Sequence, residues 1–300
     1  MIDCIYLIRN KAAVDATILT KDKVIPEYAK SHGIALENIA AIGDEVTDIP
    51  MLEVAGLGIA GAPSNAQKRV IEAVRKLPNG WVSPEGVEVF NAFLEFYSLA
   101  GQRGISHVVS DRDGVLVSKG DLSRGKEYLG LLQQMGAEGR PYVTALTGSA
   151  VSQNKEFMEK YGLVDPSLRS NPAIRENPYL VLAENGLIHI NVLTGEALNF
   201  SKKLNPDLLK RLKQEFEPAV AMKIEAEVLD EFGLRWSGSY DDQDGKIYIP
   251  PKLGMVTFNI PRHVKGKDYR NSEESEKLRD RIISIMAETA ENRDIPYKIL

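Results

Sequence analysis

Two carboxylates follow one of the strands that the sequence predicts. Residues 107–109 predict a buried strand, and the chain continues as Ser110-Asp111-Arg112-Asp113-Gly114. Carboxylates at i and i+2 just past a strand can divide two tasks. One can bind a metal ion and attack, and the other can exchange protons with a leaving group. Gly114 would permit the tight turn. Taken alone, the segment is also typical of a surface turn rich in Asp and Gly.

A second pair of carboxylates lies at another predicted strand end. The strand expected over 39–42 leads into Gly43-Asp44, and Asp48 follows four residues after Asp44. This spacing puts both carboxylates on one face of the turn, where hard oxygen ligands suit Mg²⁺. The alternative is that Asp44 is only the N-cap of the next helix.

Hydroxyl, amide and ammonium groups complete the set of candidate residues. The strand expected over 142–146 ends in Thr147-Gly148-Ser149. A hydroxyl and exposed amides at a helix start form either an anion-binding corner or an ordinary N-cap. Lys21 opens the helix before the Asp44 strand, and Lys23 lies nearby. Lysines at such positions are usually solvated, and the choice between these two as the candidate residue stays open.

A mostly parallel sheet would bring these groups together. Strands and helices alternate along the first 161 residues, which predicts an α/β fold with a Rossmann-like parallel sheet. Ligands bind at the carboxyl ends of strands in such sheets, so Asp44, Asp111, Asp113 and Thr147 are expected to converge. The predicted strands are 2–8, 12–19, 39–42, 57–60, 107–109 and 142–146, and the predicted helices are 22–32, 46–54, 66–74, 87–99, 122–135 and 151–161.

The pattern changes after about residue 178. Short strands joined by turns and hairpins follow, together with two amphipathic helices, which indicates an α+β module added to the α/β part. The predicted strands here are 179–183, 187–191, 234–239, 246–249 and 255–260, and the predicted helices are 206–216 and 273–291.

Composition excludes several classes of protein. The 300 residues carry a formal net charge of -5 without a long run of one sign, which disfavours nucleic acid as a partner. The single cysteine, Cys4, and four scattered histidines cannot build a zinc site of normal spacing. There is no secretory leader pattern and no apolar run of the ~18 residues that would span a bilayer. We expect a cytoplasmic protein without a membrane partner.

Together these segments resemble the haloacid dehalogenase-like (HAD) phosphatases. That family's signature consists of a DxDG[TV] strand end, a Thr/Ser strand end, a Lys and a GDxxxD strand end. The matching residues here are Asp111 to Val115, Thr147, Lys21 and Gly43 to Asp48. In addition, Glu184-Asn185-Gly186 resembles the sugar-phosphatase branch with an inserted α+β cap, subclass IIB.

The resemblance implies a site and a mechanism. Mg²⁺ would be held by Asp111, the backbone carbonyl of Asp113, and Asp44. Asp111 would form an aspartyl phosphate, and Asp113 would exchange protons with the leaving group and with water. The remaining candidates are Thr147 and Lys21 as phosphoryl-binding groups, Asp48 as the residue that orients Lys21 or a metal-bound water, and Gly148 and Asn185 as substrate-binding residues.

The order of the motifs departs from the family. Lys21 and Gly43 to Asp48 precede Asp111, which is typical of a circular permutation cut between cap and Lys, with the old ends joined near 99–104. The resemblance then implies a core over 1–198, made of segments 1–103 and 104–198, and a cap over 199–300. Asp44 and Asp111 would meet either within one chain or between two chains of a homodimer.

Three functions are compatible with these residues. The first is a Mg²⁺-dependent phosphatase acting on a small phosphorylated sugar or sugar acid. The second is a phosphotransferase or phosphomutase on the same scaffold, which a bisphosphate requirement would distinguish. The third is a non-catalytic binding protein, against which the intact set Asp111, Asp113, Lys21 and Asp44 argues.

Overall fold

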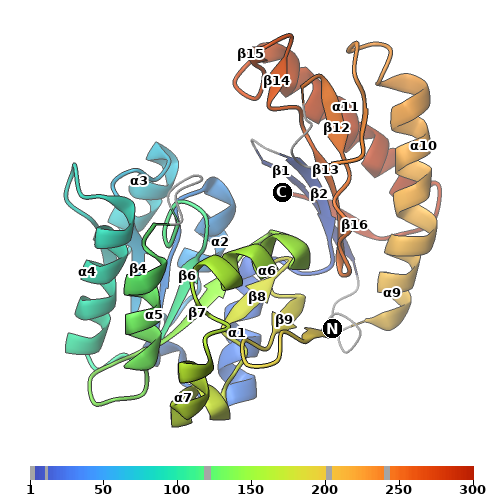
Figure 1. Cartoon of the computed structure of the whole chain (residues 1–300). Coiled ribbons are helices and arrows are strands. Elements are labelled where there is room, and N and C mark those ends of the chain that lie inside the picture. Colours follow the sequence, from blue (N-terminus) through green and yellow to red (C-terminus); the bar gives the residue numbers. More distant parts are fainter. Residues whose placement is uncertain (1–3, 11–12, 118–122, 201–204, 240–243) are drawn as a thin grey trace. The chain divides into compact units, whose positions relative to one another are not determined.

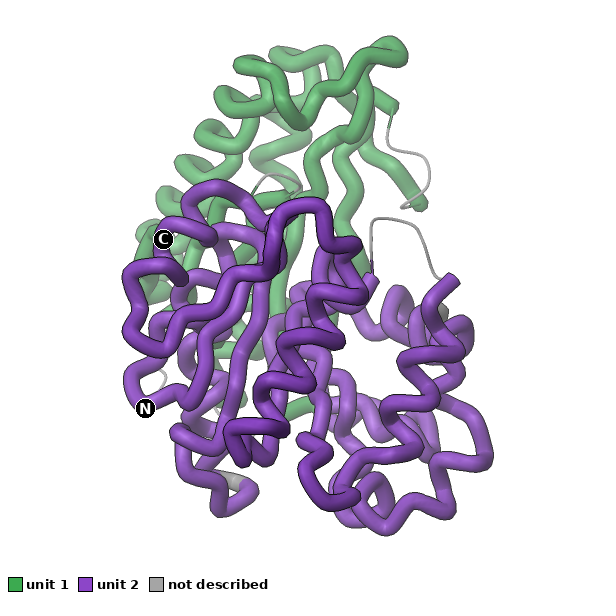
Figure 2. The backbone as a smooth tube through the Cα atoms, turned by 90° about the vertical axis from the view of Figure 1, so that its left-hand side faces the viewer, with its two compact units in different colours: residues 1–19, 199–300 green, residues 20–198 purple. Residues whose placement is uncertain are grey.

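The computed structural model of the chain describes residues 4–10, 13–117, 123–200, 205–239 and 244–300 (Figure 1). The chain forms two compact units (Figure 2). Unit 1 consists of residues 1–19 and 199–300, and unit 2 consists of residues 20–198.

Unit 2 is built on an eight-stranded sheet. The strands β8, β7, β6, β3, β4 and β5 pair in parallel, and β9 runs antiparallel to β8. Residues 39–42, Ile-Ala-Ala-Ile, are all buried, because a parallel strand with both faces covered needs a continuous apolar run. The sheet order is β10 (Ala197–Asn199), β9 (Ile188–Ile190), β8 (Val181–Ala183), β7 (Tyr142–Leu146), β6 (His107–Asp111), β3 (Ile39–Ile42), β4 (Ile59–Ala62) and β5 (Gly80–Val82).

Helices cover both faces of this sheet. The Tyr28 hydroxyl of α1 lies 3.4 Å from the Thr144 hydroxyl of β7. On the other face, Phe96 of α4 packs against Gly61 of β4, where a Cβ atom would overlap its ring. The helices are α1 (Lys21–His32), α2 (Ile49–Leu52), α3 (Lys68–Lys76), α4 (Val89–Gln102), α5 (Gly125–Gln133), α6 (Val151–Lys160) and α7 (Pro172–Glu176), with 3₁₀ turns at Leu36–Asn38, Val46–Asp48 and Pro166–Ser170.

A ring cluster joins three of these helices. Tyr128 of α5 is fully buried, and its ring centroid lies 6.3 Å from that of Phe90 in α4 and 5.7 Å from that of Tyr161 beside α6. Phe157 of α6 lies 4.7 Å from Tyr161. Buried aromatic side chains contribute large apolar areas, so this cluster stabilises the packing of α4, α5 and α6 against one another.

His107 begins β6 at the edge of the sheet opposite the candidate site. Its ring stacks on Tyr142 with centroids 5.0 Å apart, and its Nδ1 lies 2.8 Å from the Ser106 hydroxyl. Burial and, to a smaller extent, the nearby His32 together lower the pKa of His107 to about 4. The unfolded chain therefore binds a proton at this residue before the folded chain does.

This shift predicts an acid-dependent loss of stability. Stability falls as the pH drops from about 6.5 to about 4, because only the unfolded state gains the His107 proton in that window. We expect His107→Phe, which keeps a ring beside Tyr142, to remove about 2 kcal/mol of this pH dependence. Urea unfolding of both proteins at pH 7 and pH 4.5 measures it. Equal losses in both proteins would contradict the assignment.

Unit 1 is an α+β layer. Its helix α11 packs on β1 and β2 and against α10. The sheet order is β11 (Arg235–Ser237), β12 (Lys246–Tyr248), β13 (Met255–Asn259), β2 (Ala13–Thr17), β1 (Ile5–Arg9) and β16 (Tyr297–Ile299). The remaining elements are α9 (Pro206–Arg211), a π-helical turn (Leu212–Phe216), α10 (Glu217–Glu227), α11 (Glu273–Glu291) and the hairpin β14 (His263–Val264) with β15 (Lys267–Asp268).

The structure divides the chain differently from the predicted boundaries at residues 1–19. We expected 1–198 in one domain, but 1–19 belong to unit 1. The reason is strand pairing: β2 lies between β13 and β1 and runs antiparallel to both. Strand β1 also pairs in parallel with β16. The first residues of the strands predicted at 2–8 and 12–19, and Leu122 of the helix predicted at 122–135, lie outside the described residues.

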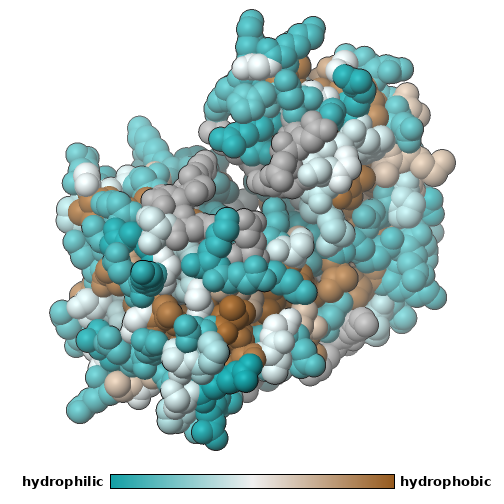
Figure 3. Space-filling view, viewed as in Figure 1, coloured by the Kyte–Doolittle hydropathy of each residue, from teal (hydrophilic) through white to brown (hydrophobic). Residues whose placement is uncertain are grey.

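The face drawn in Figure 3 is mostly hydrophilic, with small separate groups of apolar residues. Within the described ranges, no helix is long and apolar enough to cross a membrane.

Candidate active site

The carboxyl ends of three neighbouring strands of unit 2 carry the predicted residues. Asp111, the last residue of β6, pairs in register with Leu146 of β7, and Ser110 pairs with Ile42 of β3. Thr147 and Asp44 therefore follow their strands at the same sheet edge as Asp111. The predicted convergence of these strand ends is present, and a single chain supplies all three.

Lys21 lies between two carboxylates. Its Nζ is 2.5 Å from Oδ1 of Asp111 and 2.6 Å from Oδ1 of Asp48, and its side chain is 8% exposed. Lys23 is instead mostly exposed, and its Nζ lies 3.3 Å from Oδ2 of the neighbouring Asp22. Of the two lysines that the sequence left open, Lys21 is the one at the carboxylate cluster.

Asp48 anchors the loop that follows β3. Its Oδ2 accepts hydrogen bonds from the backbone N–H groups of Asp44 and Glu45, both at 3.0 Å. Gly43 is required here, because a Cβ atom at residue 43 would lie 2.5 Å from the Asp48 Cβ. With Oδ1 bound to Lys21, both oxygens of Asp48 have partners in the protein.

Asp44, unlike Asp48, has a carboxylate oxygen without a partner among the described residues. This oxygen is Oδ1, and it is buried. Gly114, at φ +88°, brings the backbone after Asp113 against this carboxylate, and a Cβ atom there would overlap it. A buried carboxylate oxygen without a partner is costly unless a cation binds it.

The donor set fits a divalent cation. One oxygen each from Asp44, Asp48 and Asp111 lie within 4.8 Å of one another. Hard carboxylate oxygens in this arrangement are typical ligands of Mg²⁺, although Asp48 is already engaged by Lys21 and two amides.

The charges of the cluster also favour a bound cation. Burial raises the pKa of Asp44, and the neighbouring carboxylates Asp111 and Asp48 raise it further. Burial also raises the pKa of Asp111, although Lys21 opposes this shift. Burial alone would lower the pKa of Lys21, but Asp111 and Asp48 outweigh it and the pKa is raised. One lysine thus compensates one of three carboxylates, and a bound cation would stabilise the ionised form of the others.

Asp113 points away from this cluster. Its side chain is 53% exposed, and its Oδ2 lies 2.6 Å from Nη2 of Arg112 and 3.4 Å from the Ser149 hydroxyl. The preceding residue Arg112 is buried, and Asn154 of α6 accepts from its Nη1 at 2.8 Å. The sequence motifs had indicated no role for Arg112, Ser149 or Asn154. The signal that could have found one of them is a charged residue between two aspartates.

Thr147, Gly148 and Asn185 lie together. The Thr147 hydroxyl accepts from the Ser149 N–H at 3.1 Å, and the Thr147 carbonyl accepts from the Asn185 N–H at 2.9 Å. A Cβ atom at Gly148 would come within 3.3 Å of Oδ1 of Asn185. Asn185 has φ +56°, so the residues predicted to bind substrate form a tight turn beside Thr147.

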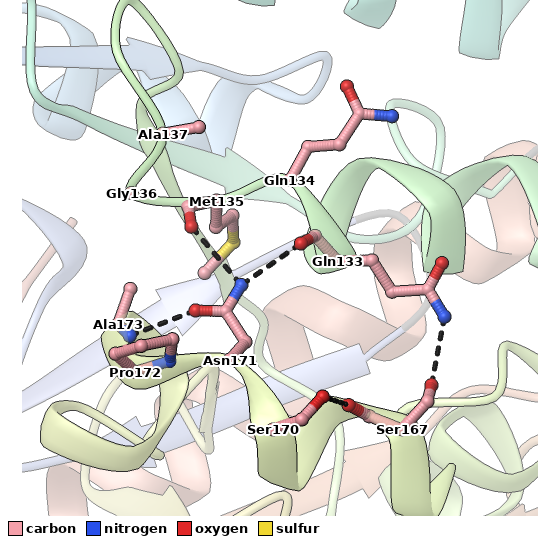
Figure 4. A pocket seen from close by; sticks show the side chains of 10 residues that line it. All are labelled: Gln133, Gln134, Met135, Gly136, Ala137, Ser167, Ser170, Asn171, Pro172 and Ala173. Carbon is pink, nitrogen blue, oxygen red and sulfur yellow. Dashed lines mark hydrogen bonds between the residues drawn. The ribbon is translucent and has the colours of Figure 1, made fainter.

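A cavity without predicted site residues lies elsewhere in unit 2. It has a volume of about 530 Å³ and is lined by residues at the end of α5 and by residues from 167–173 (Figure 4). Asn171 closes it: its Nδ2 donates to the carbonyls of Leu132, Gln133 and Met135, and its Oδ1 accepts from Ala173. Its lining has no ionisable side chain, so these contacts serve helix capping and not chemistry.

Gly114 provides a test of the cation site. Gly114→Ala is expected to cost about 1 kcal/mol of stability because residue 114 has a left-handed backbone, and the added Cβ atom also displaces the Asp44 carboxylate. Gly104→Ala is the matched control, because Gly104 has φ +71° but no atom within 4 Å of the added Cβ. We expect Mg²⁺ to raise the melting temperature of wild type and Gly104→Ala, and to raise that of Gly114→Ala much less. Equal rises in both variants would show that Asp44 does not bind the ion.

One comparison with known proteins gave a match. A family model described as haloacid dehalogenase-like hydrolase matches residues 14–79. The matched segment contains Lys21, Asp44 and Asp48, and it supports placing this α/β chain in the HAD superfamily of hydrolases. The searches of curated proteins and of solved structures gave no match. The assignment of the Asp111 half of the site therefore rests on geometry.

Proposed function

We propose that this chain is a Mg²⁺-dependent phosphatase that acts on a small phosphorylated sugar or sugar acid through an aspartyl phosphate on Asp111. The observation that carries the proposal is the position of Asp111, at the end of β6, 2.5 Å from the Lys21 ammonium and beside the unpartnered Asp44 oxygen. The family match over residues 14–79 supports hydrolysis as the type of reaction.

Each residue has a task in two half-reactions. In the first, a bond forms between an Asp111 oxygen and phosphorus, the bond from phosphorus to the leaving oxygen breaks, and Asp113 protonates that oxygen. In the second, Asp113 takes a proton from a water molecule and the oxygen of that water bonds to phosphorus. The bond between phosphorus and the Asp111 oxygen breaks, which releases the carboxylate. Lys21 and the Thr147 hydroxyl stabilise charge on the phosphoryl oxygens.

The metal would be held by Asp44, Asp111 and the backbone carbonyl of Asp113. When bound, Mg²⁺ neutralises charge on the carboxylates and on the phosphoryl group. The protein's own part is to keep this cluster buried and to hold Asp48 in place through the Asp44 and Glu45 amides, so that Asp48 in turn holds Lys21.

We also infer that the chain is a permuted HAD protein whose cap consists of both 1–19 and 199–300. The motif order supports the permutation, and the pairing of β1 and β2 with β13 and β16 supports the composition of the cap. The choice of a sugar phosphate rests on the resemblance of Glu184-Asn185-Gly186 and on the α+β character of unit 1.

A phosphate-release screen over sugar phosphates and phosphorylated sugar acids tests the function. We expect turnover of at least one compound with Mg²⁺, a fall of about 100-fold or more with EDTA, and recovery when Mg²⁺ is restored in excess. Turnover that is unaffected by EDTA would contradict the metal-dependent mechanism. Absence of phosphate release from every compound, including aryl phosphates, would contradict the phosphatase itself.

A further inference from the structure

Arg112 is a buried cation beside the candidate site. Its side chain is 9% exposed, and its Nη1 donates to Oδ1 of Asn154 at 2.8 Å. Its Nη2 donates to the Ser149 hydroxyl at 2.8 Å and to Oδ2 of Asp113 at 2.6 Å. The guanidinium carbon lies 5.6 Å from the ring centroid of Phe157. Helix α6 and the loop before it thus hold the guanidinium group in one orientation.

This arrangement distinguishes the two oxygens of Asp113. Nε and Nη2 of Arg112 and the hydroxyl of Ser149 all approach Oδ2, at 3.1, 2.6 and 3.4 Å. Among the described residues, Oδ1 of Asp113 accepts no hydrogen bond. The contacts of the carboxyl group are therefore all at Oδ2. The Asp113 side chain is 53% exposed.

We propose that Arg112 is a positioning residue that holds Asp113 by Oδ2 so that Oδ1 carries the exchanged proton. The inference rests on the proposed function, in which Asp113 is the acid and then the base. As the bond from phosphorus to the leaving oxygen breaks, that oxygen takes the proton of Oδ1. As the water oxygen bonds to phosphorus, the proton of that water returns to Oδ1.

A purely structural role for Arg112 makes a different prediction. The same contacts also join the loop after β6 to α6, and loss of that link would slow every substrate alike. Loss of a correctly oriented acid slows only those substrates whose leaving group needs a proton. Two aryl phosphates of similar shape separate these effects: phenyl phosphate has the poorer leaving group, and p-nitrophenyl phosphate leaves without protonation.

The test compares kcat/KM for these two probes, because kcat/KM covers only the steps up to cleavage of the leaving group. For Arg112→Met we expect a fall of about 30-fold with phenyl phosphate and of less than about 3-fold with p-nitrophenyl phosphate. Asp113→Asn should change the ratio in the same direction and by more. In the Asp113→Asn background, Arg112→Met should leave the ratio unchanged, because the residue acts through Asp113.

Two further variants control for folding. Arg124→Met is the matched control: Arg124 also lies over a ring, Phe90, at 5.1 Å, and pairs with two carboxylates, Glu88 and Glu127. We expect it to leave the ratio of the two probes unchanged. Ser149→Ala keeps Arg112 but removes one contact to Asp113 and one to Arg112, so a smaller change of about 2- to 5-fold in the ratio is expected.

The outcomes are distinct. A ratio that is unchanged in both Arg112→Met and Ser149→Ala overturns the positioning role while the phosphatase stands. If the wild type releases phosphate from neither aryl probe nor any sugar phosphate, the proposed function fails and the inference fails with it.

Discussion

Asp111→Asn is expected to lose at least about 1,000-fold in turnover with Mg²⁺ present while the fold remains intact. The amide has nearly the same shape as the carboxylate and can still accept the hydrogen bond of Lys21, but it cannot form an acyl phosphate. Burial raises the pKa of Asp111 from 3.8 to about 8, so stability is lost as the pH rises through that window, because there only the unfolded state releases the proton. Without a metal ion, the variant should therefore be at least as stable as the wild type at high pH.

Phosphate release and urea unfolding measure the two halves of this prediction. Asp207→Asn, at an exposed position in the first turn of α9, is the control and should keep full activity. Retention of even a tenth of the wild-type rate by Asp111→Asn would rule out the covalent mechanism. A large loss of stability would instead show that Asp111 is mainly structural.

Lys21→Met is expected to lower both activity and stability. The variant leaves Asp44, Asp48 and Asp111 in a buried cluster without their cation, which costs about 3 kcal/mol in the absence of metal. Turnover should fall by about 100-fold or more, because the ammonium group no longer stabilises the phosphoryl oxygens. Mg²⁺ should stabilise the variant more than it stabilises the wild type, since the ion replaces part of the missing charge.

Lys23→Met is the matched control for this prediction. Lys23 lies two residues away on the same helix, but its side chain is 58% exposed, so its removal should change stability by less than about 0.5 kcal/mol. Thermal melts with and without Mg²⁺, together with phosphate release, compare the two variants. The reverse order of effects would mean that Lys23 binds the phosphate.

The candidate site was largely predictable because it depends on local patterns. Asp44, Asp111 and Thr147 each follow a short apolar strand, and neighbouring parallel strands end at the same sheet edge. The choice between Lys21 and Lys23 was not predictable, because it depends on which side of α1 faces the cluster. The role of Arg112 was missed for a similar reason: its partners Ser149 and Asn154 are about 40 residues away in the chain.

The bounds of the helices and strands of unit 2 were predicted closely. The sheet of unit 1 was not predicted, because its strands pair with segments far away in the sequence. The strands at 39–42 and 142–146 have the predicted bounds, because their apolar runs end at Gly43 and Thr147. The helix predicted to end at 216 continues to Glu227 through a π-helical turn, which accommodates Pro218 at the start of α10. Residues 13–17 pair with residues 255–259, and no local pattern reveals such a partner.

The pairing of β2 with β13 also constrains the order in which the protein folds during synthesis. Unit 2 is continuous in sequence from 20 to 198, so it can close as soon as those residues leave the ribosome. The strands β1 and β2 are made first but must wait for β13 and β16, which come about 240 to 290 residues later. Until then their ladder edges are unpaired, and β1 and β2 can pair only with each other. The nascent chain should therefore resist protease within residues 20–198 before it does so within residues 4–17.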